Sequence, residues 1–517
     1  MTKQRLIRLR LEKPITPSDL AAHPVVAAGL GKSTSAQGSV IYYDTHNLEL
    51  WQRGSILSLC HQEEAWLQRI GPVQTEESLD ASEQMEKITL KSATPHFSQF
   101  KEQKKSRKYI GQIPIKSLEP LFAMELRKTR WTLTFPESTR LLLILEEGQI
   151  QHNNHLQPFC ELLLYYKSGD PLRFHQTALA LAHDFSPLLG CAAPEIRFFL
   201  GLHPKKGINF SYQEIKPPKS GTTAETALTI VCRDLVQAVR HALCPLLHGQ
   251  DEERFAALEQ FRAMVTRIRV LLDLYRPLLP QSIRADLDSE LNWLMAETGP
   301  AWLWDLFSLH TLKSFMVWFA GDGEPNHSEF LGLTNQIQAV REKTWQRSIS
   351  AISSFRFTRL ILGLENWLAS LGWQPMIDLP QKQQLNKPVK ELSLEALHDL
   401  HRAIPDLMRS FPDISENRLR SLIDATSMLA DLVWFFSQVY VSQHAKTYAI
   451  QLNAFLNSLR RLEELQRAGR LIKQIVSPAD HPTVHLARGW LSAIQMQRNG
   501  EVIATGEQFL RLKPFWI

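Results

Sequence analysis

Arginines recur at a regular interval in the segment 254–277, "RFAALEQFRAMVTRIRVLLDLYRP". Arg262, Arg269 and Arg276 are seven residues apart, and residues at this spacing share one face of a helix. Guanidinium groups in such a row can hold successive phosphates of a polyphosphate chain through bidentate hydrogen bonds. Solvated arginines beside an apolar stripe would give the same pattern. The spacing therefore predicts either an anion-binding helix face or an ordinary exposed one.

A second set of basic residues lies in "EALHDLHRAIPDLMRSF". His398, Arg402 and Arg409 follow one another at intervals of four and seven residues, which again places them on one helix face. They could bind phosphate, or the histidine could be neutral and simply packed or solvated. Pro405 lies inside this segment, and we expect it to kink or end the helix because it cannot donate a backbone hydrogen bond.

Two further segments invite a phosphate interpretation. The cluster "KEQKKSRKY" at 101–109 is either a solvated loop or a flap that attracts anions, and it lacks the interleaved aromatics that stack on bases. The stretch "GLGKST" at 29–34 lacks a phosphate loop's first glycine, because Val26 stands at that position. We interpret it as a turn.

The elements that must position these residues differ between the two parts of the chain. The first 200 residues contain strand-like runs such as "RLIRLRLE", "SILSLC" and "RLLLILEEGQI", several alternating with period two. The segment "DPLRFHQTALALAHDF" reads as a helix opened by Asp170 and Pro171. From Ala224 to about Asn499, apolar-periodic segments of helical length follow one another. The pattern predicts an α+β protein with a mostly antiparallel sheet at 1–205, a linker at 206–221 and an all-α helical bundle at 222–517.

Composition restricts the partners. The 517 residues contain 58 Lys+Arg against 53 Asp+Glu, a net charge of +5, which is too small for general nucleic-acid binding, so any anion site should be local. The five cysteines include no pair at metal-ligand spacing, as expected for buried thiols in a reducing compartment. The N-terminus lacks a signal-peptide core, and no apolar run approaches ~18 residues. We expect a cytoplasmic protein without a membrane span.

Several stretches together resemble a known family. "YYDTHNLELWQRGSIL", "KTRWTL", "LLLILEEGQI" and "FCELLLYYKSGDPLRFHQTALALA" resemble the CYTH, or triphosphate tunnel metalloenzyme, domain. The helical half resembles the CHAD domain, and "RFTRLILGLENWLASLGW" with the terminal "PFWI" is similar to the companion domain of bacterial inorganic triphosphatases. The resemblance implies a closed antiparallel β-barrel whose inward side chains line a tunnel. It also implies basic residues that neutralise a triphosphate, carboxylates that hold Mg²⁺ or Mn²⁺, and a water that attacks the terminal phosphorus.

The family's charged positions are only partly occupied. The opening Glu-x-Glu-x-Lys of the family corresponds here to Leu6, Arg8 and Arg10, which removes both carboxylates. Ser58 and Cys60 stand where the family has arginines. The basic pair before the tryptophan is retained as Lys128 and Arg130. The retained acids, which are the candidate metal ligands, are Glu86, Glu146 and Glu161.

The CHAD-like half has lost part of its basic pattern in the same way. The family's His-x-x-Arg-x-x-x-Arg-Arg-x-Arg begins here with Glu259 and retains Arg262 and Arg269 in the first copy. The second copy keeps His398 but has Pro405 at one of the basic positions.

These observations give one leading hypothesis and two alternatives. The leading one is a divergent CYTH–CHAD protein, a pseudoenzyme with weak or lost hydrolysis, that binds triphosphate, polyphosphate or a protein partner. An active triphosphatase using Mg²⁺ or Mn²⁺ is the first alternative, because a one-residue slip of the first strand would reverse its faces. A non-catalytic interaction scaffold, favoured by an apolar lumen, is the second. The expected anion-binding residues are Arg8, Arg10, Lys128, Arg130, Arg262, Arg269, Arg276, His398 and Arg402.

Overall fold

A computed structural model describes residues 5–29, 31, 33–62, 65–73, 85–96, 100, 104–203, 214–320, 327–475 and 482–516. The chain forms two compact units. The first comprises Met1–Tyr212, Arg240–Ala257 and Ile352–Ser370, and the second comprises the remaining segments, Gln213–Val239, Leu258–Ala351 and Leu371–Ile517. The predicted boundaries at 205 and 222 follow the chain order, whereas these two units interleave in sequence.

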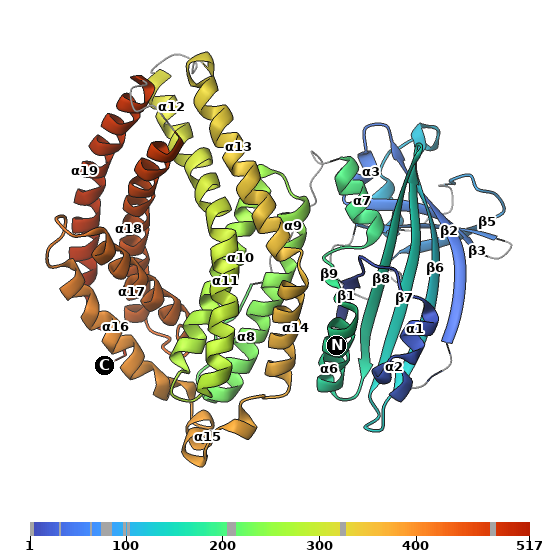
Figure 1. Cartoon of the computed structure of the whole chain (residues 1–517), viewed down its shortest axis with the longest axis horizontal. Helices are drawn as coiled ribbons and strands as arrows, with labels where there is room; N and C mark the ends of the chain where they lie inside the picture. The colour runs from blue at the N-terminus through green and yellow to red at the C-terminus, as the bar shows by residue number, and fades with distance from the viewer. Residues whose placement is uncertain are drawn as a thin grey trace. The chain divides into compact units, whose positions relative to one another are not determined.

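The first unit is built on a nine-stranded sheet in the order β5-β4-β3-β2-β6-β7-β8-β1-β9 (Figure 1). Its strands are β1 (Leu6–Arg10), β2 (Ser33–Thr45), β3 (Ser55–Gln62), β4 (Ala65–Pro72), β5 (Glu86–Leu90), β6 (Leu118–Thr134), β7 (Arg140–His152), β8 (His155–Ser168) and β9 (Leu188–Leu189). Every pairing between these strands is antiparallel. The predicted antiparallel sheet is therefore confirmed. Within the described residues β5 and β9 remain as its two edges.

One face of the long strand β8, which pairs with β7, packs against helix α6 (Pro171–Phe185). Leu143, Leu145 and Leu162 on this face are completely buried, since strands alternate and every second residue points toward the helix. The predicted start of α6 is confirmed: Asp170 accepts a hydrogen bond from the Leu172 backbone N–H at 2.9 Å.

Helix α14 (Phe355–Ala369) also belongs to the first unit, although it lies far along the chain. It packs against α6 and β9, and the Leu189 backbone N–H donates to Thr358 Oγ1 at 2.8 Å. The other helices of this unit are α1 (Pro17–Ala22), α2 (Pro24–Ala28), α3 (Glu49–Gln52), α5 (Lys104–Ile110), α7 (Pro194–Leu202) and α9 (Leu243–His248).

Most of the remaining helices are long, and the predicted all-α second half is confirmed. They are α8 (Ala224–His241), α10 (Asp251–Leu274), α11 (Gln281–Leu306), α12 (Lys313–Ala320), α13 (His327–Ile352), α15 (Leu379–Leu385), α16 (Ser393–Met408), α17 (Glu416–Phe435), α18 (Gln443–Ile475) and α19 (Pro482–Leu510). A π-helical segment at Phe307–Leu312 joins α11 to α12. In the described part of this region the strand content is a single bridge between Thr223 and Pro388.

Candidate functional site

The opposite face of the sheet carries the predicted basic residues and is called the cationic face below. Strand register places Arg10 beside Glu161, Glu161 beside Glu146, and Glu146 beside Lys128. Arg8 and Arg130 lie two residues away on the same face, because alternate residues of a strand point to one side. The structure therefore brings together the four cations that the sequence assigned to the sheet.

The two acids on this face are held by cations. Arg8 Nη1 donates to Glu161 Oε2 at 2.5 Å and lies 3.9 Å from Glu146 Oε2. Lys128 Nζ lies 2.5 Å from Glu146 Oε1. Arg197, from helix α7, donates to the other oxygen of Glu161. Each carboxylate thus touches two cations.

Burial and charge act in opposite directions on these groups. Burial disfavours the charged carboxylate of Glu146, but Lys128 and Arg8 outweigh it and lower the pKa of Glu146. Burial also disfavours the charged guanidinium of Arg8, yet Glu161 and Glu146 more than compensate and raise its pKa. Both shifts favour the ionised forms of Glu146 and Arg8.

Arg10 and Arg130 make no ion pair within the described residues. Arg130 is exposed and lies across from Ile144 of β7. Arg10 is partly buried, and its pKa is lowered first by burial and then by the charge of Arg197, although Glu161 opposes both. These two guanidinium groups are therefore candidates for contact with an external anion.

The sequence analysis missed further cations on the cationic face. Ser58 pairs with Arg69 of β4, and Arg69 pairs with Lys87 of β5, so both cations share the face of Ser58. Arg69 thus lies directly across from the position where the resemblance implies an arginine. The pairing of β3 with β4 was not predicted, so no sequence signal located Arg69.

Helix α7 lies against this face. Phe198 packs edge-on against Phe122 of β6 with ring centroids 5.1 Å apart. Glu195 hydrogen-bonds to Tyr42 of β2, and burial together with this carboxylate raises the pKa of Tyr42. Arg197, described above, comes from the same helix. The alternation of strand residues does not predict where this helix packs.

The candidate metal ligands are not brought together. Glu86 pairs with Ile70, which belongs to the apolar cluster on the opposite face, so Glu86 cannot join Glu146 and Glu161. Glu86 lies on a strand, as the sequence predicted, but on the face away from Glu146 and Glu161. No group of three or more His, Cys, Asp or Glu side chains suited to a metal occurs within the described residues.

An apolar cluster adjoins the charges on the cationic face. Leu6, Ile144, Leu163 and Tyr165 are buried together, with Leu142 packed against them. Leu6 stands where the resemblance implies a metal-binding carboxylate. The face is therefore partly cationic and partly apolar.

The predicted arginine row of α10 is only partly formed. Arg262 points into the helical bundle, where its Nη1 donates to Thr298 Oγ1 and to the Met295 carbonyl, both at 2.9 Å. Burial, and then the charge of Arg467, lower the pKa of Arg262 to about 10. Arg269 is half-buried on the same helix. Arg276 lies beyond the helix end at Leu274 and pairs with Asp273, so it leaves the predicted row.

The second basic set lies on α16. This helix continues through Pro405 and ends three residues later at Met408, so it does not end at the proline. Arg402 is exposed, and His398 Nδ1 is buried without a hydrogen-bond partner within the described residues. His401, one turn away, bonds Tyr448 Oη at 2.9 Å, and burial lowers its pKa. No phosphate-binding arrangement is evident in these contacts.

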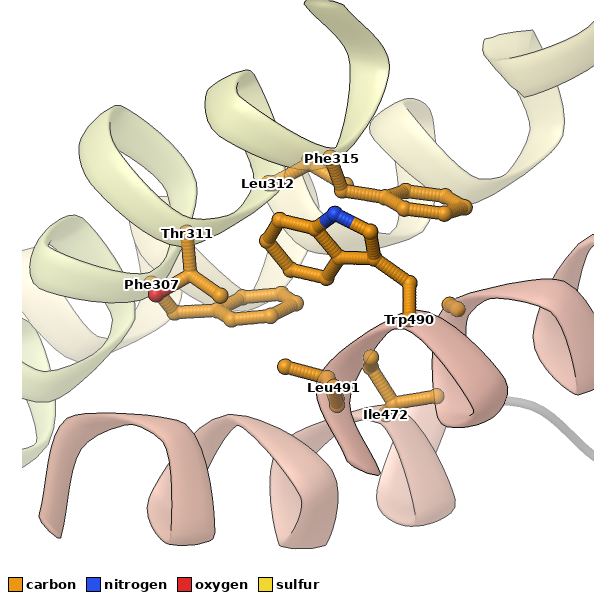
Figure 2. A pocket seen from close by; sticks show the side chains of 8 residues that line it. Phe307, Thr311, Leu312, Phe315, Ile472, Trp490 and Leu491 are labelled. Carbon is orange, nitrogen blue, oxygen red and sulfur yellow. The ribbon is translucent and has the colours of Figure 1, made fainter. Parts of the chain in front are cut away.

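An apolar pocket lies between α12, its preceding π-helical segment, α18 and α19. Figure 2 shows the Trp490 indole between Phe307 and Phe315, with Leu491 and Ile472 beneath it. Thr311 contributes the one polar side chain of the lining. The pocket offers no charged group and is part of the bundle core.

Part of the basic segment 101–109 lies outside the described residues. Residues 104–110 form α5, and residues 101–103 are not described. Of "GLGKST", Leu30 and Lys32 also fall outside, while Ser33 opens β2.

The comparison with protein families matches residues 232–473 to the CHAD domain. Residues 232–473 are therefore similar to a CHAD domain. A comparison with curated proteins finds no match. In the described residues no helix is long and apolar enough to cross a membrane.

Solved structures similar to the chain include two kinds of protein. The CHAD domain from the plant Ricinus communis is 22% identical, with a TM-score of 0.48, over 58% of this chain and 97% of its own. A putative adenylyl cyclase from Hippeastrum, described as having a dominant triphosphatase activity, is 15% identical, with a TM-score of 0.27, over 39% and 96%. A putative adenylate cyclase from Bacillus halodurans is 15% identical, with a TM-score of 0.25, over 38% and 99%.

The family match agrees with the predicted CHAD resemblance of the helical half. The matched residues, 232–473, lie within the half of the chain that the sequence predicted to be CHAD-like. With identities under 25% and TM-scores under 0.5, the solved structures carry no argument about activity. The question of activity depends on the side chains of the cationic face.

Proposed function

We propose that this CHAD protein binds inorganic triphosphate or polyphosphate on the cationic face and hydrolyses it weakly or not at all. The observation that carries the proposal is the pairing of both acids with cations: Glu146 with Lys128, and Glu161 with Arg8 and Arg197. A triphosphatase site would keep such acids free for a divalent cation.

The side chains present do not fit Mg²⁺ or Mn²⁺. Mg²⁺ requires six oxygen ligands in a near-octahedral arrangement and is usually held by at least one or two unpaired carboxylates. Here Arg8 lies 2.5 Å from one acid and 3.9 Å from the other, so a positive charge occupies the space beside both. Glu86 faces away. We therefore derive no metal-dependent step for this chain.

A polyanion fits the same face better. Arg10, Arg69, Lys87 and Arg130 add positive charge to the ion-paired cluster, while Glu195 is the further acid near Tyr42. The Nε atoms of Arg8 and Arg69 are buried and have no hydrogen-bond partner among the described residues. A buried guanidinium N–H without an acceptor is costly, and a phosphate oxygen would satisfy it.

Two assays separate binding from hydrolysis. Calorimetry with tripolyphosphate in the presence of a chelator should give binding, and Arg10→Ala/Arg130→Ala should weaken it at least tenfold, since each charge-assisted contact contributes roughly 1.5 to 3 kcal/mol. Arg127→Ala, on the other face of β6 and paired with Glu147, is the matched control and should leave affinity unchanged.

Phosphate release with Mg²⁺ or Mn²⁺ should be at least ~10²-fold slower than a typical turnover of about 10 per second. Turnover of several per second would instead establish the active triphosphatase. A native protein that binds no tripolyphosphate would favour the interaction scaffold, for which the apolar cluster around Leu6 on the cationic face is the supporting observation.

A further inference from the structure

The Glu161 carboxylate lies between the guanidinium groups of Arg8 and Arg197. Its side chain is 1% exposed, and its two oxygens accept hydrogen bonds from different guanidinium groups, those of Arg8 and Arg197. Carboxylate and phosphate offer guanidinium the same pair of oxygen acceptors. An anion that approaches Arg8 or Arg197 must therefore compete with the Glu161 carboxylate, which is already bound to both guanidinium groups.

Glu146 repeats this arrangement on the next strand. It sits directly across from Glu161 in the β7–β8 register and is held by Lys128 at 2.5 Å. Lys128 is more open than the other partners, with 36% of its side chain exposed. The Lys128 ammonium is thus the cation of the ion-paired cluster that a solvent-borne anion can reach first.

The packing around Arg8 restricts how its side chain can move. Gly190 lies against its aliphatic stem, where an added Cβ would stand 2.7 Å from Arg8 Cγ, and the Gly190 backbone N–H donates to the Arg8 carbonyl at 2.9 Å. The stem is therefore fixed, and exchange of partners takes place at the guanidinium end. Arg8 Nε still lacks an acceptor in this arrangement.

We infer that Glu146 and Glu161 act as built-in competitors of the bound polyanion, holding Arg8, Lys128 and Arg197 until phosphate oxygens replace them. This inference rests on the proposed function. It adds that Glu146 and Glu161 limit the affinity of the cationic face for the polyanion. When phosphate binds, each displaced carboxylate remains near a like charge, which opposes binding. Removing one negative charge while keeping an oxygen acceptor should then strengthen binding.

The same two residues would behave in the opposite way as metal ligands. A carboxylate that holds Mg²⁺ loses the ion when it becomes an amide, so the substitution would weaken metal-dependent phosphate binding. As competitors, the glutamates weaken metal-free binding in the native protein. The sign of the change in affinity therefore distinguishes the two roles.

The test compares three full-length proteins by calorimetry with sodium tripolyphosphate in a chelator at moderate salt. Glu146→Gln should bind roughly tenfold more tightly than the native protein, because a neutral acceptor no longer repels the ligand. Glu147→Gln is the control: it makes the same change in net charge one residue along β7, on the opposite face, where Glu147 pairs with Arg127. Its affinity should equal that of the native protein.

Glu161→Gln should also bind tripolyphosphate more tightly than the native protein, provided that the variant folds. Thermal unfolding shows whether it does. Because Glu146 is the less enclosed of the two acids, its variant keeps the test valid if Glu161→Gln does not fold.

Each outcome decides something. Tighter binding by Glu146→Gln but not by Glu147→Gln supports the inference. Equal or weaker binding by Glu146→Gln overturns it, even when the native protein binds and the proposed function stands. If only Glu146→Gln binds tripolyphosphate, the inferred competition by Glu146 is supported, but the proposed function of the native protein is contradicted. Absence of binding by all three proteins overturns both.

Discussion

The cationic face and the arginine-bearing helix α10 were predicted from similar spacing, yet their cations are used differently. On the sheet, Arg8 and Lys128 meet Glu161 and Glu146 because adjacent strands bring residues of one face to within contact distance. On α10, Arg262 meets a hydroxyl and a backbone carbonyl and stacks 5.4 Å from the Trp302 ring centroid. Regular spacing of cations therefore does not by itself indicate an anion site.

The difference between the two regions lies in which side chains surround each cation. A sheet face collects residues from many strands, so acids and bases of distant sequence segments neutralise one another. A helix face is covered by whatever element packs on it, and α11 supplies Thr298 and Met295 to Arg262. The comparison yields four predictions, ordered by the size of the expected effect on stability.

The largest effect is expected for Glu161→Leu. The substitution leaves Arg8 and Arg197 without their shared carboxylate in a buried position, which should cost about 3–5 kcal/mol. Urea unfolding measures it. Glu147→Leu instead removes the half-buried partner of the exposed Arg127 and should cost less than about 1 kcal/mol, so equal losses would show that the position of Glu161 is not special.

The second effect concerns another buried acid of the first unit. Burial alone would raise the pKa of Glu365, but Arg240 at 3.0 Å and His175 outweigh it and lower the pKa to about 2. A folded-state pKa below the unfolded value of about 4.3 gives stability that is complete above pH ~5 and is lost as the pH falls toward 2.

This stabilisation amounts to about 3 kcal/mol at neutral pH. Unfolding followed between pH 7 and 3 should therefore show a shallower acid loss in Glu365→Gln than in the native protein. Parallel pH profiles would contradict the ion pair's contribution.

The third effect concerns the two arginines of α10. Arg262→Ala removes two hydrogen bonds and the contact with Trp302, and it should cost about 2 kcal/mol. Arg269→Ala, one heptad along the same helix and half-buried, should cost less than about 1 kcal/mol. Chemical denaturation of the two variants provides the comparison. A larger loss for Arg269→Ala would mean that the helix face is oriented differently.

The smallest effect is expected for Arg127→Ala. Arg127 is 51% exposed and pairs with Glu147 on the face away from the cluster, so its loss should change stability by less than about 0.5 kcal/mol. A thermal shift measurement checks it, and a large shift would contradict the separation of the two faces.

The residues of the cationic face were predictable to different degrees. Lys128, Arg130 and Glu146 were placed correctly because β6 and β7 are long and alternate regularly, which fixes the side of every residue. Glu86 was misplaced because β5 is short, and its face is set by pairing with β4, through which Ile70 and Ile88 join one apolar cluster. Arg69 was missed for the same reason.

The sequence by itself determined the antiparallel sheet, the helical second half and which cations lie in regular rows, since these follow from period two, period 3.6 and cap residues. Only the tertiary structure decided what each cation touches. Arg197 reaches Glu161 from a helix 36 residues away, and Arg276 leaves its row because α10 ends two residues earlier. Ion pairs are short-range contacts between distant segments, and their formation depends on register and helix packing, which local periodicity does not encode.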